Sequence, residues 1–371
     1  MNKKLNVGVL GFGRIGGSVV KIIDEGKNKN FKVTKIFDLP TKKSLIGPRF
    51  EENAVSIITD PNIDIIVDTL GGYDFPYQLI KSALRFRKHV ITANKEIVAK
   101  NIEELTTLAD ENEVAFLYEA TVCGGLPIVY PLSVNARCSE VSSIYGIMSG
   151  SANYILTRMQ IDWIDYKKSV ELAEENKFME KNPKEDLNGM DVSRKLAILA
   201  DIAYQTKVNA EDVYRRPIST VNEEIVEFVR NNKQVIKYIG ILSKKGRSLN
   251  ISVEPYIFNE NHYFASINEE ENVLIMNSKY NGKLTFSGLG VGGDPTATAI
   301  VTDILRVLNG IIGYGYENQN TYNINPKKEY KGEYFVKMKG EEPTYMDAKA
   351  LQKLLDDKKL QFYAKVWEEI E

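Results

Sequence analysis

Short apolar runs alternate with amphipathic segments along the first 120 residues of the chain. The apolar run at 5–10 predicts a buried strand, and residues 14–25 place Val19, Val20 and Ile23 on one face of a helix. Further strands are expected within 31–39, 63–72, 88–95 and 114–120, and further helices at 76–87 and 101–113. Strands that alternate with helices are typical of a parallel sheet covered by helices on both faces.

The pattern changes beyond residue 130. Strand-like runs at 142–150, 248–258, 263–267, 272–278 and 282–290 accompany helical patterns at 153–160, 166–176 and 191–204. This mixture predicts a mostly antiparallel sheet that carries helices, which is an α+β domain. A helical pattern follows at 294–311, and the C-terminal segment reads as strand, helix and strand.

The stretch 182–199 joins a polar segment to an apolar helix. Asn182-Pro183 and Asn188-Gly189 predict a loop, after which Val192, Leu196 and Leu199 form one apolar face. Asp191 and Lys195 have the spacing of an ordinary surface ion pair, worth about 0.2–0.5 kcal/mol. The apolar run 196–200 instead predicts a buried helix, and buried charges are costly unless they are paired or used. The spacing by itself favours the surface pair, and a polar site that also includes Asp186 is the alternative.

Composition narrows the class of protein. A chain of 371 residues can form two or three domains, and a net charge of −2 gives no basic surface for nucleic acid or an anionic membrane. No apolar run is long enough to cross a bilayer. Cys123 and Cys138 are the two cysteines, too few for a disulfide framework, so a reduced cytoplasm is the expected location. These properties favour a small-molecule ligand.

Glycines follow the first strand with the spacing G-x-G-x-x-G, at Gly11, Gly13 and Gly16. In a dinucleotide-binding turn the first glycine permits the turn, the second admits the pyrophosphate, and the third lets the helix pack on the strand. The spacing alone is weak, but its place between a strand and a helix supports a Rossmann-type doubly wound domain. Asp38 ends the second strand, where a carboxylate binds ribose hydroxyls and favours NAD. Lys42 and Lys43 would favour NADP, so NAD is only slightly preferred.

Seven segments, taken in order, resemble homoserine dehydrogenases. They are 8–16 (GVLGFGRIG), 68–72 (DTLGG), 90–96 (VITANKE), 118–128 (YEATVCGGLPI), 146–156 (GIMSGSANYIL), 185–200 (EDLNGMDVSRKLAILA) and 288–304 (GLGVGGDPTATAIVTDI). The resemblance implies NAD(P)-dependent interconversion of L-homoserine and L-aspartate 4-semialdehyde, in threonine and methionine biosynthesis. It also implies a homodimer formed through the sheet of the substrate domain.

The resemblance organises the chain into domains. Residues 1–130 would bind the dinucleotide, completed by a helix near 294–312, and 131–293 would bind substrate and dimerise. Residues 327–371 would form a β-α-β tail, which is either a degenerate remnant of an amino-acid-sensing ACT-type domain or an extra piece packed on the body.

The resemblance also implies site residues. Lys195 is the expected catalytic lysine, and Lys95 should lie beside the nicotinamide and the substrate; taken alone, Lys95 could equally be loop surface. The substrate would contact Glu180, Asp186, Asp191, Gly150 and Ser151. The cofactor would contact Gly11, Phe12, Gly13, Arg14, Ile15, Gly16, Asp38, Leu70, Gly71, Thr92, Lys95 and Gly292. A Na⁺ or K⁺ ion would be held by the Glu119 side chain and the carbonyls of Val122, Gly124 and Leu126. The alternative for Glu119 is a cap on the next element.

Several positions depart from the family pattern. Lys177-Phe178 replaces the usual Gly-Tyr, which removes a hydroxyl near the substrate, and Cys123 stands where small residues are common. Two alternative functions stay open: a nucleotide-binding sensor without turnover, and a dehydrogenase of a related amino-acid alcohol. An aspartate-semialdehyde dehydrogenase would need a nucleophilic cysteine with a histidine partner, and neither His89 nor His262 neighbours Cys123 in the sequence.

Overall fold

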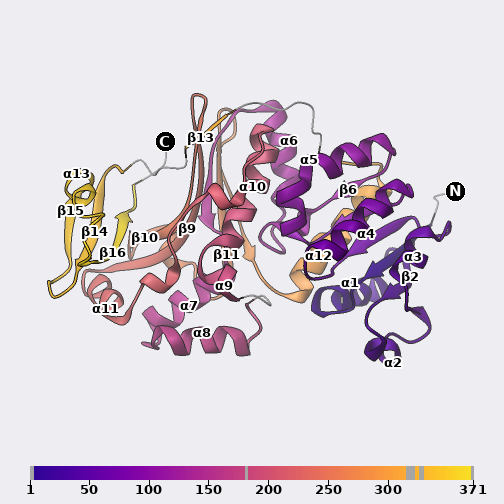
Figure 1. The fold of residues 1–371 in the computed structure, drawn as a ribbon, viewed down its shortest axis with the longest axis horizontal. Coiled ribbons are helices and arrows are strands. Elements are labelled where there is room, and N and C mark those ends of the chain that lie inside the picture. Colours follow the sequence, from indigo (N-terminus) through magenta and orange to yellow (C-terminus); the bar gives the residue numbers. More distant parts are fainter. Residues whose placement is uncertain (1–3, 180–182, 315–321, 326–329, 369–371) are drawn as a thin grey trace. The chain divides into compact units, whose positions relative to one another are not determined.

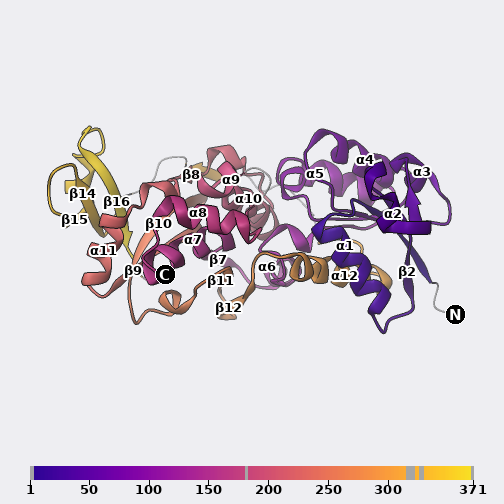
Figure 2. The same ribbon diagram turned by 90° about the horizontal axis from the view of Figure 1, so that it is seen from below.

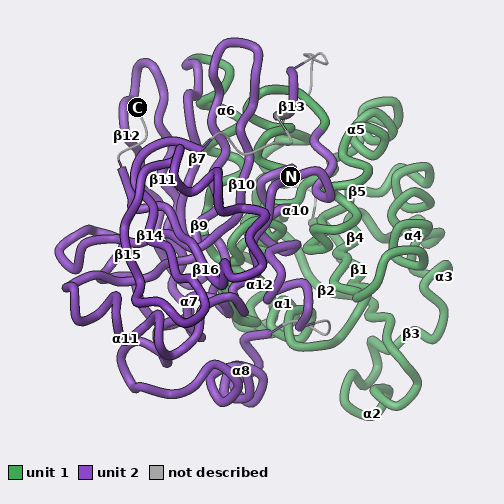
Figure 3. The backbone as a smooth tube through the Cα atoms, turned by 60° about the vertical axis from the view of Figure 1, so that its left-hand side comes forward, with its two compact units in different colours: residues 1–138, 198–207, 291–320 green, residues 139–197, 208–290, 321–371 purple. Residues whose placement is uncertain are grey.

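The computed structural model describes residues 4–179, 183–314, 322–325 and 330–368 (Figure 1). The chain divides into two compact units, which Figure 3 distinguishes by colour. Unit 1 contains residues 1–138, 198–207 and 291–320, and unit 2 contains residues 139–197, 208–290 and 321–371. The division falls inside one helix, α10 (Met190–Tyr204), whose first half belongs to unit 2.

Unit 1 is built on a six-stranded parallel sheet, as the alternating pattern predicted. Its strands are β1 (Leu5–Leu10), β2 (Phe31–Phe37), β3 (Phe50–Glu51), β4 (Ile65–Asp68), β5 (His89–Thr92) and β6 (Phe116–Leu117). They lie in the order β3-β2-β1-β4-β5-β6. The direction of the strand order therefore reverses at β1, with β2 and β3 on one side of it and β4, β5 and β6 on the other. In doubly wound sheets ligands bind at this reversal point, beyond the carboxyl ends of the strands.

Helices cover both faces of this sheet. Helices α1 (Arg14–Glu25) and α12 (Gly293–Leu308) pack together on one face, and α3 (Ala54–Thr59), α4 (Asp74–Arg85) and α5 (Lys95–Glu111) pack on the other (Figure 2). The short helix α2 (Lys43–Ile46) follows β2, and α6 (Val129–Cys138) follows the last strand. The doubly wound fold is therefore confirmed, and the 294–311 pattern forms a helix of this unit.

Several elements of unit 1 differ from the prediction. Helix α5 begins at Lys95, where the Asn94 side chain accepts the Ile97 N–H and caps it, and it is kinked at Asn101 (φ −133°, ψ 19°), so the predicted helix forms its second part. Strand β6 is limited to two residues before a 3₁₀ turn at Glu119–Thr121. Helix α6 was not predicted, since its apolar residues do not follow a clear helical period.

Unit 2 contains a mixed, mostly antiparallel sheet, as predicted. Its main path runs β12-β11-β7-β9-β10-β16-β14-β15, and β8 and β13 also pair with β10. The strands are β7 (Val141–Ile147), β8 (Tyr214–Arg215), β9 (Gln234–Lys245), β10 (Ser248–Asn259), β11 (Glu271–Ser278), β12 (Gly282–Leu289), β13 (Asn323–Asn325), β14 (Glu333–Met338), β15 (Thr344–Asp347) and β16 (Leu360–Val366). Strands β8, β13 and β16 pair with β10 in parallel.

The helices of unit 2 are α7 (Gly150–Ile161), α8 (Tyr166–Glu175), α9 (Pro183–Leu187), the first half of α10, α11 (Glu223–Asn231) and α13 (Ala348–Gln352). Ile239 and Ile241 of β9 enter a cluster of buried apolar side chains against which Trp367 packs. Side chains alternate along a strand, so Tyr238 and Gly240 of β9 face the opposite side. Gly240 lies against Val192 and Leu196, which places α10 on that side.

The C-terminal segment extends this sheet. Strand β16 pairs with β10 and with β14, and β14 pairs with β15. The prediction of a strand, a helix and a strand for this segment missed one element, because the additional strand β15 precedes α13. Among the described residues, none of the helices combines the length and the apolar character that crossing a membrane requires.

Candidate functional site

The glycine-rich turn has the backbone geometry that its spacing predicts. Gly11 has φ 98°, and a Cβ atom on Gly16 would lie 1.9 Å from the carbonyl oxygen of Gly11. A side chain at Gly16 would therefore separate helix α1 from β1. At Gly13 an added Cβ would meet no atom of the described residues within 4 Å, so the backbone there is open to a ligand. The residues present fit a bound pyrophosphate, which needs close access to main-chain N–H groups at a helix start.

A threonine that sequence reasoning missed supports this turn. Thr69 Oγ1 donates to the carbonyl oxygens of Leu10 at 3.1 Å and Gly11 at 2.9 Å. Its main-chain N–H also donates to Leu10 O at 2.9 Å. Thr69 follows β4, so it ties the end of that strand to the end of β1.

The start of α12 meets the start of α1. Ser18 Oγ donates to Asp294 Oδ1 at 2.6 Å, and a Cβ on Gly293 would lie 2.9 Å from Arg14 Cγ. Gly292, with φ 131°, precedes α12, and this conformation, which favours glycine, lets the chain turn into the helix. Because both helix N-termini carry partial positive charge, their convergence beside the glycine turn favours an anionic ligand.

A buried carboxylate organises the carboxyl ends of β4 and β5. Asp68 accepts the Thr92 hydroxyl at 2.7 Å and the Leu70 N–H at 3.2 Å. Burial raises the pKa of Asp68 to about 6, and these two hydrogen bonds oppose the rise. Asp68 was not among the predicted site residues, although its place at a strand end, like that of Asp38, could have indicated it. It positions Leu70 and Thr92, two of the expected cofactor contacts.

Asp38 lies beside the glycine turn, as its position after β2 predicted. Its carboxylate accepts the Phe12 N–H at 2.5 Å and the Leu39 N–H at 2.6 Å. The 3₁₀ turn Pro40–Lys42 and helix α2 follow, so Lys42 and Lys43 come directly after this carboxylate in the chain.

Lys95 is the first residue of α5 and is half-buried. The preceding Asn94 both caps this helix and donates to Gly72 O at 2.8 Å, which links the loop after β5 to the glycines after β4. The predicted residues Leu70, Gly71, Thr92 and Lys95 thus lie on two neighbouring strand ends.

Glu119 acts as a cap in this structure. Its carboxylate accepts the N–H groups of Ile128 and Val129, both at 2.7 Å, and of Tyr130 at 3.0 Å, at the start of α6. The Arg306 guanidinium pairs with the same carboxylate at 2.5 Å. A carboxylate offers about four acceptor positions, and four protein donors use them.

This arrangement leaves the Glu119 side chain poorly suited to hold a cation, so the alternative that it caps the next element agrees better with the geometry. Val122, Gly124 and Leu126 lie in the buried loop after Glu119. Among the described residues no group of three or more His, Cys, Asp or Glu side chains forms a metal-binding cluster.

In unit 2, Lys195 and Asp191 form a buried ion pair. Lys195 Nζ lies 2.7 Å from Asp191 Oδ2 and donates to Met148 O, also at 2.7 Å. Lys195 is 5% exposed and Asp191 is 3% exposed, which confirms that this helix is buried. An ammonium group has three N–H donors, and two of them have these partners among the described residues.

The start of α7 lies beside another carboxylate. Ser151 Oγ donates to Asp186 Oδ1 at 3.1 Å and lies 3.0 Å from Ser149 Oγ. Ser149 caps α7 by accepting the Ala152 N–H at 3.2 Å, so Gly150 and Ser151, both buried, form the first turn of this helix. Met148 immediately precedes Ser149, so the turn after β7 contacts both Lys195 and Asp186.

The predicted substrate residues Gly150, Ser151, Asp186 and Asp191 therefore lie in one region of unit 2, while Glu180 lies outside the described residues. The loop predicted from residue 182 was wrong in part, because Pro183–Leu187 forms the short helix α9. Proline is favoured at a first helical position. Phe178, which departs from the family pattern, packs edge-on against Tyr154 at 4.9 Å between ring centroids.

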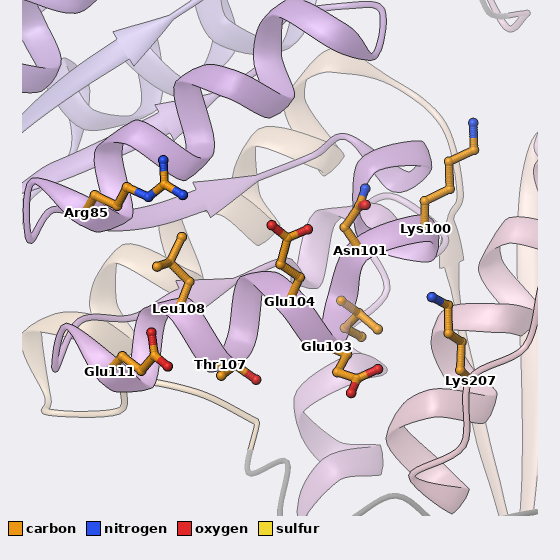
Figure 4. A pocket seen from close by; sticks show the side chains of 10 residues that line it. Arg85, Lys100, Asn101, Glu103, Glu104, Thr107, Leu108, Glu111 and Lys207 are labelled. Carbon is orange, nitrogen blue, oxygen red and sulfur yellow. The ribbon is translucent and has the colours of Figure 1, made fainter.

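A separate hollow of about 410 Å³ lies beside α5 in unit 1 (Figure 4). Arg85, Lys100, Asn101, Glu104 and Lys207 are among its lining residues, and none of the predicted site residues that the structure describes lines it. Its side chains are mostly exposed and of both charges, which differs from the enclosed, partly apolar lining typical of a cofactor site.

A parallel sheet with an open glycine turn, together with a buried lysine held by carboxylate and carbonyl oxygens, defines a nicotinamide-nucleotide-dependent oxidoreductase. Residues 11–119 match the family model of the homoserine dehydrogenase NAD-binding domain, and residues 127–305 match that of homoserine dehydrogenase. Homoserine dehydrogenase of Bacillus subtilis is 32% identical over 335 residues, which cover 85% of this chain and 77% of the relative. The chain belongs to the homoserine dehydrogenase family.

Solved structures agree with this assignment. The Staphylococcus aureus homoserine dehydrogenase at pH 7.5 is 30% identical with a TM-score of 0.71, covering 91% of this chain and 84% of that one. A homoserine dehydrogenase from Thiobacillus denitrificans, 22% identical, has the same fold with a TM-score of 0.88 over 98% of each chain.

Proposed function

We propose that this chain interconverts L-homoserine and L-aspartate 4-semialdehyde with a nicotinamide cofactor, as a step in threonine and methionine biosynthesis, and that Lys195 is its acid/base. The observation that supports the proposal best is the buried ammonium of Lys195, held by Asp191 Oδ2 and Met148 O. Two fixed acceptors orient the third N–H of the group, which can serve the oxygen of a substrate.

The residues of the site divide the chemistry between them. The nicotinamide, when bound, accepts or supplies the hydride. During reduction the Lys195 ammonium stabilises the developing alkoxide and gives it a proton, and during oxidation the neutral Lys195 amine takes the proton of the alcohol and becomes the ammonium. Asp186 and Asp191 neutralise the α-ammonium of the substrate, with Glu180 as a further carboxylate. The N–H groups at the start of α7, at Gly150 and Ser151, hold the substrate carboxylate.

The remaining parts of the proposal concern unit 1 and assembly. The glycine turn, the start of α12 and Leu70, Gly71, Thr92 and Lys95 would hold the cofactor, with Lys95 beside the nicotinamide. The carboxylate of Asp38 beside the turn supports NAD over NADP, since it can accept ribose hydroxyls and repels a 2′-phosphate. A homodimer through the sheet of unit 2 is part of the same proposal, and light scattering of the purified protein tests it.

The decisive experiment measures NADH and NADPH consumption with aspartate semialdehyde for the wild type, Lys195→Ala and Lys168→Ala. Lys168 is an exposed lysine of α8 and serves as the matched control. We expect a loss of about 10²–10⁴-fold in kcat for Lys195→Ala and wild-type rates for the control. Full activity in Lys195→Ala would exclude this acid/base. If the wild type oxidised another amino-acid alcohol but not homoserine, the proposed substrate would be wrong. If it bound the nucleotide without any turnover, it would be a sensor.

A further inference from the structure

The C-terminal strands take no part in the chemistry above, yet Arg216 connects them to the body of unit 2. Arg216 is 8% exposed, and its guanidinium lies 3.6 Å from the centroid of the Tyr363 ring of β16. The same guanidinium donates to the carbonyl oxygen of Tyr363. A stacked and hydrogen-bonded guanidinium has little freedom, so the position of Arg216 is coupled to that of β16.

The main chain of Arg216 is fixed as well. Its N–H donates to Val253 O of β10 at 2.9 Å, and its carbonyl oxygen accepts the Tyr238 hydroxyl at 2.8 Å. Tyr238 is buried in β9, the neighbour of β10. Because a buried hydroxyl needs a partner, this hydrogen bond orients the phenol ring.

The Tyr238 phenol contacts the residue from which α10 begins. A Cβ atom on Gly189 would lie 2.4 Å from Tyr238 Oη, so the Gly189 backbone rests against the hydroxyl. Gly189 has φ 84°, and its carbonyl accepts both the N–H and the hydroxyl of Ser193 at 2.9 Å. These bonds form the first turn of α10, which carries Asp191 and leads to Lys195.

We propose that Arg216 and Tyr238 are positioning residues that couple strand β16 to the first turn of α10, and thereby set the placement of Asp191 and Lys195 for the amino-acid substrate. This inference rests on the proposed function of those two residues. According to this proposal, the C-terminal strands help to hold the residues of the substrate site in position.

The coupling acts at one end of α10 in particular. Beyond the first turn, Val192 and Leu196 pack against Gly240 of β9, and this apolar contact does not depend on Tyr238. Loss of the Tyr238 hydroxyl therefore leaves the helix in place and loosens its start. A misplacement of about 1 Å in a reacting geometry can cost about 10²-fold in rate. The contact between the α-ammonium of the substrate and Asp191 should weaken most, and nucleotide binding in unit 1 should not change.

The test compares Tyr238→Phe and Arg216→Met with Tyr363→Phe, in full-length protein. Tyr363→Phe is the matched control, because it keeps the ring and the carbonyl that Arg216 uses and removes the hydroxyl, which contacts Tyr214 and Tyr330. We expect KM for homoserine to rise about fivefold in Tyr238→Phe, as for the loss of one hydrogen bond, and at least as much in Arg216→Met. KM for the nucleotide should stay at the wild-type value in all three variants, and Arg216→Lys should recover part of the loss.

Hydrogen exchange of residues 183–195 supplies a readout that needs no turnover. We expect faster exchange in Tyr238→Phe than in the wild type, and unchanged exchange in Tyr363→Phe. A homoserine KM within twofold of wild type and unchanged exchange in Tyr238→Phe would overturn the inference. An equal rise of KM in Tyr363→Phe would overturn it too, since that indicates general loosening. A wild type that does not oxidise homoserine would instead refute the proposed function, and the exchange data would still decide the coupling.

Discussion

Lys195 Nζ and Asp191 Oδ2 lie 2.7 Å apart on one buried face of α10. The spacing is that of an ordinary surface pair, but burial changes its energetics, because each charge depends on the other for compensation. We predict that Asp191→Leu lowers stability by about 3–5 kcal/mol, since Lys195 keeps its charge without its partner. Denaturant unfolding of the purified variant measures this loss.

The double variant Asp191→Leu with Lys195→Met is the matched control for that prediction. Replacing both members of a buried pair by apolar side chains is often neutral, so stability should return close to the wild-type value while activity stays lost. If the double variant were as unstable as the single one, the cost would come from packing rather than from an unpaired charge.

Alanine substitutions at two neighbouring glycines of α1 should have different effects on the protein. A Cβ on Gly16 would lie 1.9 Å from Gly11 O, whereas a Cβ on Gly17 would meet no atom within 4 Å. Gly16→Ala should therefore abolish nucleotide binding, and Gly17→Ala should raise stability by up to about 1 kcal/mol. Isothermal titration with NADH and thermal unfolding measure the two effects. Equal nucleotide affinity in both variants would contradict the role assigned to Gly16.

Asp38 should control the choice of cofactor. Asp38→Ala removes a carboxylate that can bind ribose hydroxyls and repel a 2′-phosphate. We expect kcat/KM with NADH to fall about tenfold, in line with the loss of a charge-assisted hydrogen bond, and kcat/KM with NADPH to rise or stay constant. Lys42→Ala is the complementary variant, and it should lower kcat/KM with NADPH but not with NADH. A parallel fall for both nucleotides in Asp38→Ala would indicate that the carboxylate serves mainly to hold the Phe12 N–H.

Asp201 of α10 should make stability depend on pH. Burial is the main cause that raises the pKa of Asp201 to about 7, the nearby Glu103 raises it further, and Lys207 opposes the shift. One of its carboxylate oxygens, Oδ1, has no hydrogen-bond partner among the residues that the structure describes. The unfolded chain loses this proton near pH 4 and the folded chain keeps it until about pH 7, so ionisation favours unfolding across that interval.

We therefore predict that Asp201→Asn gains stability relative to the wild type as pH rises from 4 to 7, by about 1.4 kcal/mol for each pH unit at most. Below pH 4 the two proteins should differ little in this respect. Unfolding by urea at several pH values measures the difference. Glu174→Gln changes an exposed carboxylate of α8 and should show no such trend; a parallel trend in both variants would contradict the assignment.

Monovalent cations should have little influence on the stability of the loop after Glu119. Its carboxylate already accepts three N–H groups of α6 and pairs with Arg306. We predict that replacing Na⁺ and K⁺ by choline at constant ionic strength leaves the Tm unchanged, whereas Arg306→Met lowers it by several degrees. Arg306→Met leaves Glu119 and Asp303 without their guanidinium partner. A Tm that falls on cation removal would support an ion held by the loop carbonyls.

The sequence by itself determined the features that depend on local periodicity and on backbone conformation. Alternating apolar runs specified the parallel sheet, and the glycine spacing specified a turn in which side chains at Gly11 and Gly16 would meet the backbone. The apolar continuation after Lys195 likewise indicated a buried helix. Each single run, turn or helix signal is contained in fewer than twenty consecutive residues, because period and φ preference are properties of neighbours in the chain.

The tertiary structure alone decided which distant groups become partners. Glu119 is satisfied by Arg306, 187 residues later in the chain, which favours a cap over a cation ligand. Asp68 meets Thr92 because β4 and β5 are adjacent, and Arg216 meets Tyr363 because β16 joins β10. Strand order brings these groups together, and no local pattern encodes strand order, since any of several pairings would bury the same apolar faces.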